Sequence, residues 1–194
     1  MSEFGDVYSG IIEWVLDTVE ILKNNKDICL YIKPHPGEEY SFSPSNKTVV
    51  DFIIEKFGSI PTNMTVIRPD MKIKSYDLFP FIDIGVVFNG TIGLEMLLNN
   101  IPVISTGMAP YSFLDSVSRP DSREQYVEFL LGNKQVSKPH TEEVRLFSYF
   151  YFIKALIPWV LTPQARGGGI GEASFSSLKE IQPGKNKHLD HLCN

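Results

Sequence analysis

His35 stands between two prolines in the stretch "LYIKPHPGE". Proline ends strands and fixes the backbone, so Pro34 and Pro36 limit how far the imidazole can move. Lys33 lies two residues earlier, which places the lysine and histidine side chains on the same side of an extended chain. An imidazole can donate a hydrogen bond to a phosphate oxygen, and a lysine adds a positive charge. We therefore expect His35 and Lys33 to bind an anion.

A second stretch, "VVFNGTIGLE", combines polar and small residues where a strand turns into a helix. Asn89, Gly90 and Thr91 are all good helix N-caps, and Gly90 permits a tight turn. The N–H groups of Thr91, Ile92 and Gly93 are expected to point out of the sheet edge. The positive end of the helix dipole favours an anion there. The pattern therefore predicts a second anion-binding element.

Two side chains near this turn suggest contacts with a sugar or a base. Glu95 is the one charged residue of the helix, and its carboxylate could accept hydrogen bonds from ribose hydroxyls. Gly93 leaves room for a phosphate or sugar, and Tyr111 in the loop "STGMAPYSF" could pack on a base. Each feature also has a purely structural interpretation: a capped turn, a first-turn glutamate, or a tyrosine stacked on its own loop.

The elements that must position these residues alternate along the chain. Apolar runs predict strands at 28–33, 64–69, 82–88 and 102–106, and apolar spacing predicts helices at 7–24, 46–57, 75–82 and 91–100. Alternating strands and helices indicate right-handed parallel β-α-β units. We therefore predict an α/β fold, a Rossmann-like parallel sheet flanked by helices. Ligands of such sheets bind outside the carboxyl ends of the strands, where His35 and Thr91 would meet.

The C-terminal third has a different character. The stretches "DSREQYVEFLLGN" and "TEEVRLFSYFYFIKALIPWVL" predict two extra helices, and the second is aromatic nearly all round, which predicts that it is buried. We divide the chain into a Rossmann-like domain at 1–132, a helical extension at 133–162 and a loose tail at 163–194. Because a helix precedes the first strand, the chain looks like one half of something larger.

Composition argues against several classes of function. The formal net charge of −5 disfavours nucleic acid as a partner, because phosphate backbones are bound by a surplus of Lys and Arg. The two cysteines have no metal-ligand spacing, and the GxxxxGK[ST], GxSxG, HExxH and CxxC motifs do not occur. We expect no metal and no cofactor. With a polar, acidic N-terminus, we expect a cytoplasmic protein, and peripheral association with the inner membrane face stays open.

The ordered motifs resemble the C-terminal half of bacterial capsule-polysaccharide glycosyltransferases of the GT-B type. "IKPHPGE" matches their HP motif, and "TIGLE", "IPVI", Gly107 and Tyr111 follow in the order of that family. The closest resemblance is to transferases of Kdo (3-deoxy-D-manno-oct-2-ulosonic acid). Bacterial sialyltransferases of the GT-B type have a similar HP element, which contacts the phosphate of CMP. The resemblance covers about residues 10–132.

The resemblance implies that residues 1–132 bind a nucleotide-sugar donor of the CMP-Kdo type, for capsule or surface polysaccharide biosynthesis. His35 would bind the nucleotide phosphate, Thr91 with the Gly90–Gly93 backbone would cradle it, Glu95 would hold the ribose, and Tyr111 would lie near the donor. Such enzymes work without a bound metal. Their N-terminal half usually supplies the general base and the site for a polysaccharide or glycolipid acceptor. That half is missing here, so we expect no turnover by this chain alone.

Two other interpretations stay open. A teichoic-acid-type transferase that uses a CDP-alcohol shares the GT-B half, although such enzymes usually have Asp-Tyr-Ser-Ser where this chain has Asn89-Gly90-Thr91. A non-catalytic scaffold that kept the fold is the third candidate, with the aromatic helix at 143–161 as its partner face.

Overall fold

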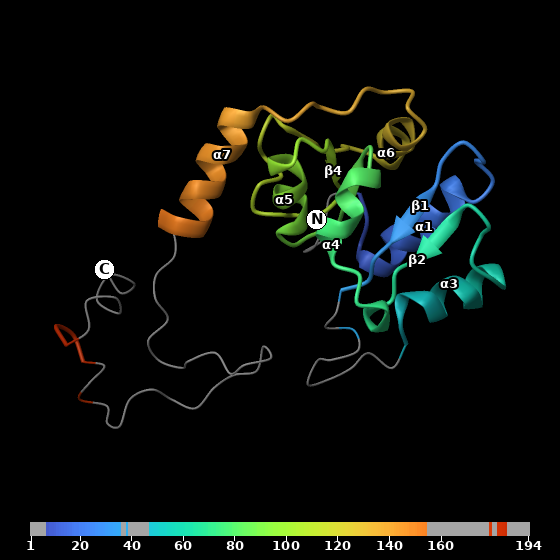
Figure 1. The fold of residues 1–194 in the computed structure, drawn as a ribbon, viewed down its shortest axis with the longest axis horizontal. Helices are drawn as coiled ribbons and strands as arrows, with labels where there is room; N and C mark the ends of the chain where they lie inside the picture. Colours follow the sequence, from blue (N-terminus) through green and yellow to red (C-terminus); the bar gives the residue numbers. More distant parts are fainter. Residues whose placement is uncertain (1–6, 36–37, 39–46, 155–178, 180–181, 186–194) are drawn as a thin grey trace.

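The computed structural model describes residues 7–35, 38, 47–154, 179 and 182–185, which form helices around two short parallel sheets (Figure 1). The strands are β1 Leu30–Ile32, β2 Met64–Val66, β3 Gly85–Val87, β4 Val103–Ser105 and β5 Val117–Ser118. The α-helices are α1 Ile11–Leu22, α3 Val49–Phe57, α4 Ser75–Leu78, α5 Ile92–Leu98, α6 Arg123–Leu130 and α7 Thr141–Tyr149. Single turns are η1 Pro69–Met71, η2 Phe79–Phe81 and the π-helical η3 Phe150–Lys154. The predicted α/β class is confirmed.

The strands pair in two separate sheets, where we expected one. β1 pairs with β2, and β3, β4 and β5 form the second sheet in that order, with every pairing parallel. The predicted strands were six, six, seven and five residues long, whereas each is three residues long in the structure. Strands this short form few ladder hydrogen bonds, and β1 and β3 are not paired. The short strand β5 was not predicted, because its sequence was interpreted as part of a loop.

Local sequence explains where the best-defined helix begins and ends. Thr48 and Asp51 form a reciprocal capping box at the start of α3, and Gly58 ends the helix in the left-handed conformation with φ of 78°. We had predicted a start at residue 46. The structure instead uses Thr48 as the cap, because its hydroxyl satisfies the backbone N–H of Asp51.

Helix α1 packs against both sheets. At one end, Trp14 lies against Phe88, the residue after β3, with ring centroids 5.7 Å apart. At the other end, Val19 and Leu22 are buried in a cluster with residues of α3 and β2, including Ile53. Because β1 and β3 are not paired, the side chains of α1 supply a direct link between the two halves of the fold.

A polar network joins α1 to α6. Tyr126 is fully buried, and its hydroxyl accepts from Trp14 Nε1 at 2.9 Å and lies 2.7 Å from Thr18 Oγ1. Thr18 donates its proton to the carbonyl of Trp14, so the Tyr126 hydroxyl is the donor to Thr18. Asp17 receives a two-pronged pair of hydrogen bonds from Arg123, both at 2.8 Å. These bonds fix α6 on the outer side of α1.

Helix α7 packs on α5 and exposes its other side, at the end of the molecule away from β1 and β2 (Figure 1). Val144 is buried in the same core cluster as Val87 and Leu94, so α7 shares the core of the β3–β5 half. The helix packs on the core through one side, as predicted, whereas Leu146 at 69% exposed and Phe150 at 57% exposed lie on its other side. The part of the predicted helix beyond residue 154 lies outside the described residues. None of the helices in the described ranges has the length and apolar character needed to cross a bilayer.

The carboxyl group of Asp17 gives the fold a testable pH dependence. Partial burial raises its pKa, but hydrogen bonds from Arg123 and Tyr8 outweigh that effect and hold the pKa below its ordinary value. A lowered pKa in the folded state stabilises the protein above the unfolded-state pKa, and this stabilisation is lost as the pH falls through the folded value. We expect Asp17→Asn to cost about 1.5–3 kcal/mol at pH 7, the range for hydrogen bonds to charged groups.

Urea unfolding of the wild type and Asp17→Asn at pH 7 and at pH 3 measures this effect, with Asp27→Asn, an exposed loop carboxylate, as the control. The difference in stability between the wild type and Asp17→Asn should shrink at pH 3. A difference of equal size at both pH values would show that the charge of Asp17 is not what stabilises the α1–α6 contact.

Candidate functional site

The turn between β3 and α5 is exposed and tightly wound. Gly90 has φ of +92°, a conformation that favours glycine, which confirms its predicted place in a tight turn. The side-chain oxygen of Asn89 accepts a hydrogen bond from the backbone N–H of Gly90 at 2.7 Å. Asn89, Gly90 and Thr91 are all exposed. The turn therefore presents polar groups to solvent at the carboxyl end of β3.

Glu95 is the centre of a small polar cluster on the first turn of α5. Its Oε1 accepts a hydrogen bond from Thr91 Oγ1 at 3.0 Å, and its Oε2 accepts one from the hydroxyl of Tyr76 in α4. The hydrogen bond to Glu95 raises the pKa of Tyr76, so this hydroxyl stays protonated at neutral pH. The expectation that Thr91 caps the helix is corrected in one respect. Thr91 holds the N-cap position, but its hydroxyl makes no capping bond to the backbone and bonds to Glu95 instead.

Tyr111 lies beneath this turn and is only 1% exposed, so its ring cannot pack on a base or sugar from this position. Its hydroxyl donates to the carbonyl oxygen of Gly90 at 2.8 Å. Burial raises the pKa of Tyr111 to about 12, although hydrogen bonds from the backbone N–H groups of Gly93 and Leu94 act in the opposite direction. Tyr111 therefore supports the turn from inside, a correction to its predicted contact with the donor.

The same tyrosine explains why residue 93 is glycine. Gly93 is buried, and a Cβ at this position would collide with the hydroxyl and ring of Tyr111. We had interpreted Gly93 as room for a phosphate or sugar. In the structure that room is filled by Tyr111. Ile92 is half-buried and packs against the core cluster around Val87 and Leu94.

Lys33 and His35 follow β1, as predicted, and the buried Pro34 lies between them. Lys33 is half-buried and His35 is exposed. A buried residue between two more exposed ones agrees with the prediction that Lys33 and His35 face the same side. The N–H of Ile67, the residue after β2, donates to the carbonyl of Ile32 at 2.8 Å. The chain after β2 is therefore hydrogen-bonded to the last residue of β1. Pro36 lies outside the described residues.

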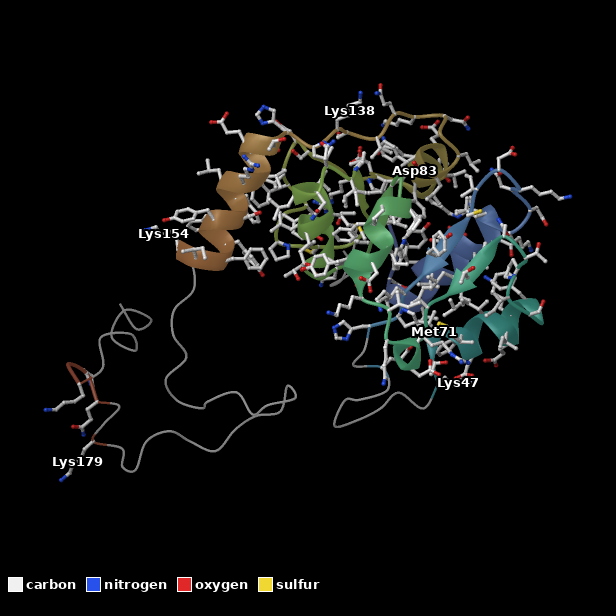
Figure 2. All side chains as sticks on the ribbon, viewed as in Figure 1. Lys47, Met71, Asp83, Lys138, Lys154 and Lys179 are labelled. Atoms are coloured by element: carbon white, nitrogen blue, oxygen red, sulfur yellow. The ribbon has the colours of Figure 1, made fainter. Side chains whose placement is uncertain are left out.

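The two predicted anion-binding elements occupy the carboxyl ends of strands from different sheets. Figure 2 labels Asp83, just before β3, and Met71, just after β2, and these two residues lie on opposite sides of the domain. The carboxyl ends of β2 and β3 therefore face the same side. The hydrogen bonds described above join Asn89 to Gly90, and Thr91 and Tyr76 to Glu95. The structure thus brings together the residues from 89 to 111, and it places the 33–35 pair at the edge of the other sheet.

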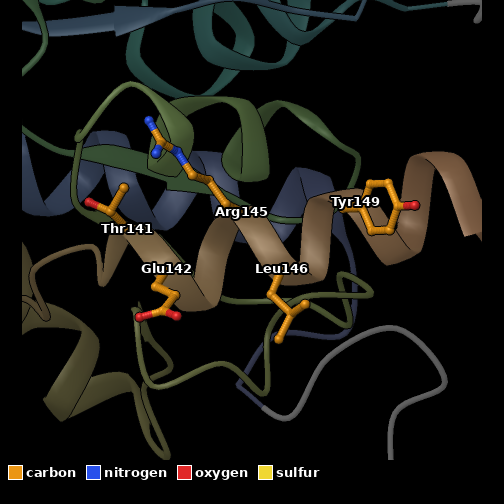
Figure 3. Close-up of a pocket in the computed structure, with 5 residues that line it drawn as sticks. All are labelled: Thr141, Glu142, Arg145, Leu146 and Tyr149. Atoms are coloured by element: carbon orange, nitrogen blue, oxygen red, sulfur yellow. The ribbon is translucent and has the colours of Figure 1, made fainter.

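Two pockets formed by the described residues lie elsewhere. One is a shallow depression on α7, and Figure 3 shows that all of its labelled residues project from that single helix: Thr141, Glu142, Arg145, Leu146 and Tyr149. The other lies at the amino ends of β3 and β4, with Ile84, Pro102 and Lys138 in its wall. Over the part of the chain that the structure describes, neither pocket is lined by a predicted site residue. Within the same residues, no three His, Cys, Asp or Glu side chains gather closely enough to hold a metal ion.

Sequence reasoning missed Tyr76. The stretch "SYDLFPFI" was interpreted only as a short helix broken by proline, and the structure divides it into α4 and η2. The tyrosine is 57% exposed, and its ring makes a T-shaped contact with the ring of Phe79 at a centroid distance of 5.2 Å. The contact with Glu95 spans 19 residues, so no local spacing rule could have paired the two.

Comparison of the chain with protein-family models, with curated proteins and with solved structures gives no match. The case for a function therefore rests on the residues described above and on their geometry.

The contact between Gly93 and Tyr111 is testable by a double-mutant cycle. Gly93→Ala should lower stability by about 1–3 kcal/mol, the usual cost of overpacking a core. Tyr111→Phe removes the hydroxyl, which is the atom nearest to the added Cβ, so the double variant should lose less than the sum of the two single losses. Gly10→Ala, which adds a Cβ in open space, is the control. If the loss of stability of the double variant in urea unfolding equals the sum of the two single losses, the direct contact is contradicted.

Proposed function

We propose that this chain is the nucleotide-sugar donor-binding domain of a metal-independent glycosyltransferase, and that its donor is a CMP-sugar of the Kdo type used for capsule or other surface polysaccharide. The acceptor is a polysaccharide or glycolipid, and peripheral association with the inner membrane face belongs to this proposal. The observation that carries it is the exposed hydrogen-bonded cluster of Thr91, Glu95 and Tyr76, which follows β3 on the same side of the domain as the ends of β1 and β2. Open parallel sheets bind ligands at that edge.

The phosphate is assigned to the cationic pair and the polar turn. Lys33 supplies a donor and a positive charge after β1 and His35 an imidazole N–H, whereas the hydroxyl of Thr91 after β3 already donates its proton to Glu95. Asn89 receives the N–H of Gly90, and Tyr111 fills the space beside Gly93. The Gly90 amide is therefore engaged within the chain, and we assign the main electrostatic role to His35 and Lys33. Positive groups placed on a leaving phosphate stabilise it without a metal.

The ribose is assigned to Glu95. A carboxylate has about four lone-pair sites, and Thr91 and Tyr76 use two of them. Two sites remain for the adjacent hydroxyls of a ribose. The negative charge of Glu95 would repel a phosphate placed directly against it, which supports a position for the sugar between the carboxylate and the phosphate.

A second candidate function has one observation in its favour. The outer face of α7 and η3 exposes Leu146, Tyr149, Phe150 and Ile153, and such a surface suits a scaffold that kept the fold and binds a partner. A CDP-alcohol transferase remains the other enzymatic alternative, and a nucleotide panel separates it from the first proposal.

Thermal unfolding with CMP, CDP, UDP and GDP compounds tests the proposal. CMP at about 100 times its Kd should stabilise the wild type by about 2.7 kcal/mol, or about 5–10 °C in a chain of this size. His35→Ala should abolish most of this shift. Lys138→Ala is the control, because it removes an exposed lysine at the edge of the domain where β3 and β4 begin (Figure 2). This variant should show the same CMP-induced shift as the wild type.

Each outcome of this panel assigns a function. A full CMP shift in His35→Ala would overturn the phosphate assignment. A preference for CDP-glycerol over CMP compounds would select the phosphotransferase, and no response to any nucleotide would favour the scaffold.

A further inference from the structure

The exposed ring of Tyr76 is an aromatic surface that the predicted site did not include. Its hydroxyl is bonded to Glu95, and its ring packs on that of Phe79 in a T-shaped contact with an interplanar angle of 69°. The side chain is nevertheless 57% exposed. A large apolar ring that is held at two points and still faces solvent is preorganised for contact with a ligand.

The cluster has a defined order along its hydrogen bonds. Thr91 binds one oxygen of Glu95 and Tyr76 binds the other, so the carboxylate lies between the polar turn and the aromatic ring. A nucleoside monophosphate has the same order of groups: phosphate, then ribose, then base. With the phosphate near Thr91 and the ribose on Glu95, the next group of the ligand reaches Tyr76.

We propose that Tyr76 is the surface on which the base of the nucleotide stacks, and that it thereby helps to determine affinity for the donor. This inference rests on the proposed function. Stacking on an aromatic face is available to every base, because each has a π-face. Tyr76 therefore supplies affinity for the base, and it does not by itself select cytosine over other bases.

Two features of the structure favour Tyr76 over the other tyrosine considered for this role. Tyr111 is only 1% exposed and its hydroxyl bonds to Gly90, so it has no free face for a base. The bond from Tyr76 to Glu95 also fixes the ring beside the carboxylate that holds the ribose, which lowers the entropic cost of ordering the ring on binding.

Isothermal titration of the full chain with CMP and with ribose 5-phosphate tests the inference. Tyr76→Ala removes the ring, and Tyr76→Phe keeps the ring and removes the bond to Glu95. Tyr149→Ala, the control, removes a tyrosine of similar exposure from α7. Tyr76→Ala should weaken CMP binding about tenfold or more, the range for loss of one stacked base. Tyr76→Phe should stay within about threefold of the wild type, and Tyr149→Ala within about twofold. Ribose 5-phosphate lacks a base, so Tyr76→Ala should leave its binding within about twofold.

Several results would overturn the inference, and they are distinguishable. If the wild type binds CMP and Tyr76→Ala binds it equally well, Tyr76 does not contact the base, and the proposed function survives. If Tyr76→Ala and Tyr76→Phe weaken CMP binding equally, the hydroxyl contributes to affinity through its bond to Glu95, and stacking on the ring is excluded. If Tyr76→Ala weakens ribose 5-phosphate as much as CMP, the ring contacts the sugar. If the wild type binds no cytidine nucleotide, the inference and the proposed function fall together.

Discussion

The packing of α1 against both sheets is the constraint on which the rest of the structure depends. The two sheets share no strand pairing, so their relative position is set by side chains, and those of α1 reach both. Ile21 does this most directly, because it packs both on the cluster that contains Phe88 and Ile104 and on the cluster that contains Leu22 and Ile53. A candidate site with one element after β1 and another after β3 needs this contact, since a shift between the sheets would separate Lys33 and His35 from the Asn89–Thr91 turn.

The polar turn after β3 illustrates how a protein can satisfy its own anion-binding groups. A helix start at the carboxyl edge of a parallel sheet offers backbone N–H groups to a ligand. Here the side-chain oxygen of Asn89 accepts a hydrogen bond from the amide of Gly90, and Tyr111 donates to the carbonyl of Gly90 from the buried side. The outward-facing chemistry therefore comes from side chains: the hydroxyls of Thr91 and Tyr76 and the carboxylate of Glu95 between them. In the proposed function, this arrangement favours a sugar at the turn and the phosphate near Lys33 and His35.

Most of the fold, but only part of the candidate site, could be predicted from the sequence. Apolar runs and helical spacing located four of the five strands and the main helices, because burial periodicity is a local property. Strand β5 was missed because its two residues, Val117 and Ser118, are too few to show a period. At the site, Gly90 was placed correctly by the rule that a tight turn needs glycine. Tyr111 and Gly93 were misjudged because their contact joins residues 18 positions apart, and Tyr76 was overlooked for the same reason. Which face of α7 is exposed depends on the position of α5. In a helix that is aromatic on nearly every side, the spacing of apolar residues does not predict that face.

The central claim is that the carboxyl edges of the two sheets form one nucleotide site, and an amide NMR titration of the isotope-labelled chain with CMP tests it most directly. The account predicts that the amide signals of Lys33 and His35 and those of Asn89 to Gly93 shift together and saturate at the same CMP concentration. Signals around α7 and around Gly132–Lys138, where the pockets lie, should stay unchanged. Shifts confined to one of the two edges, or centred on either pocket, would contradict the claim that the edges act as one site.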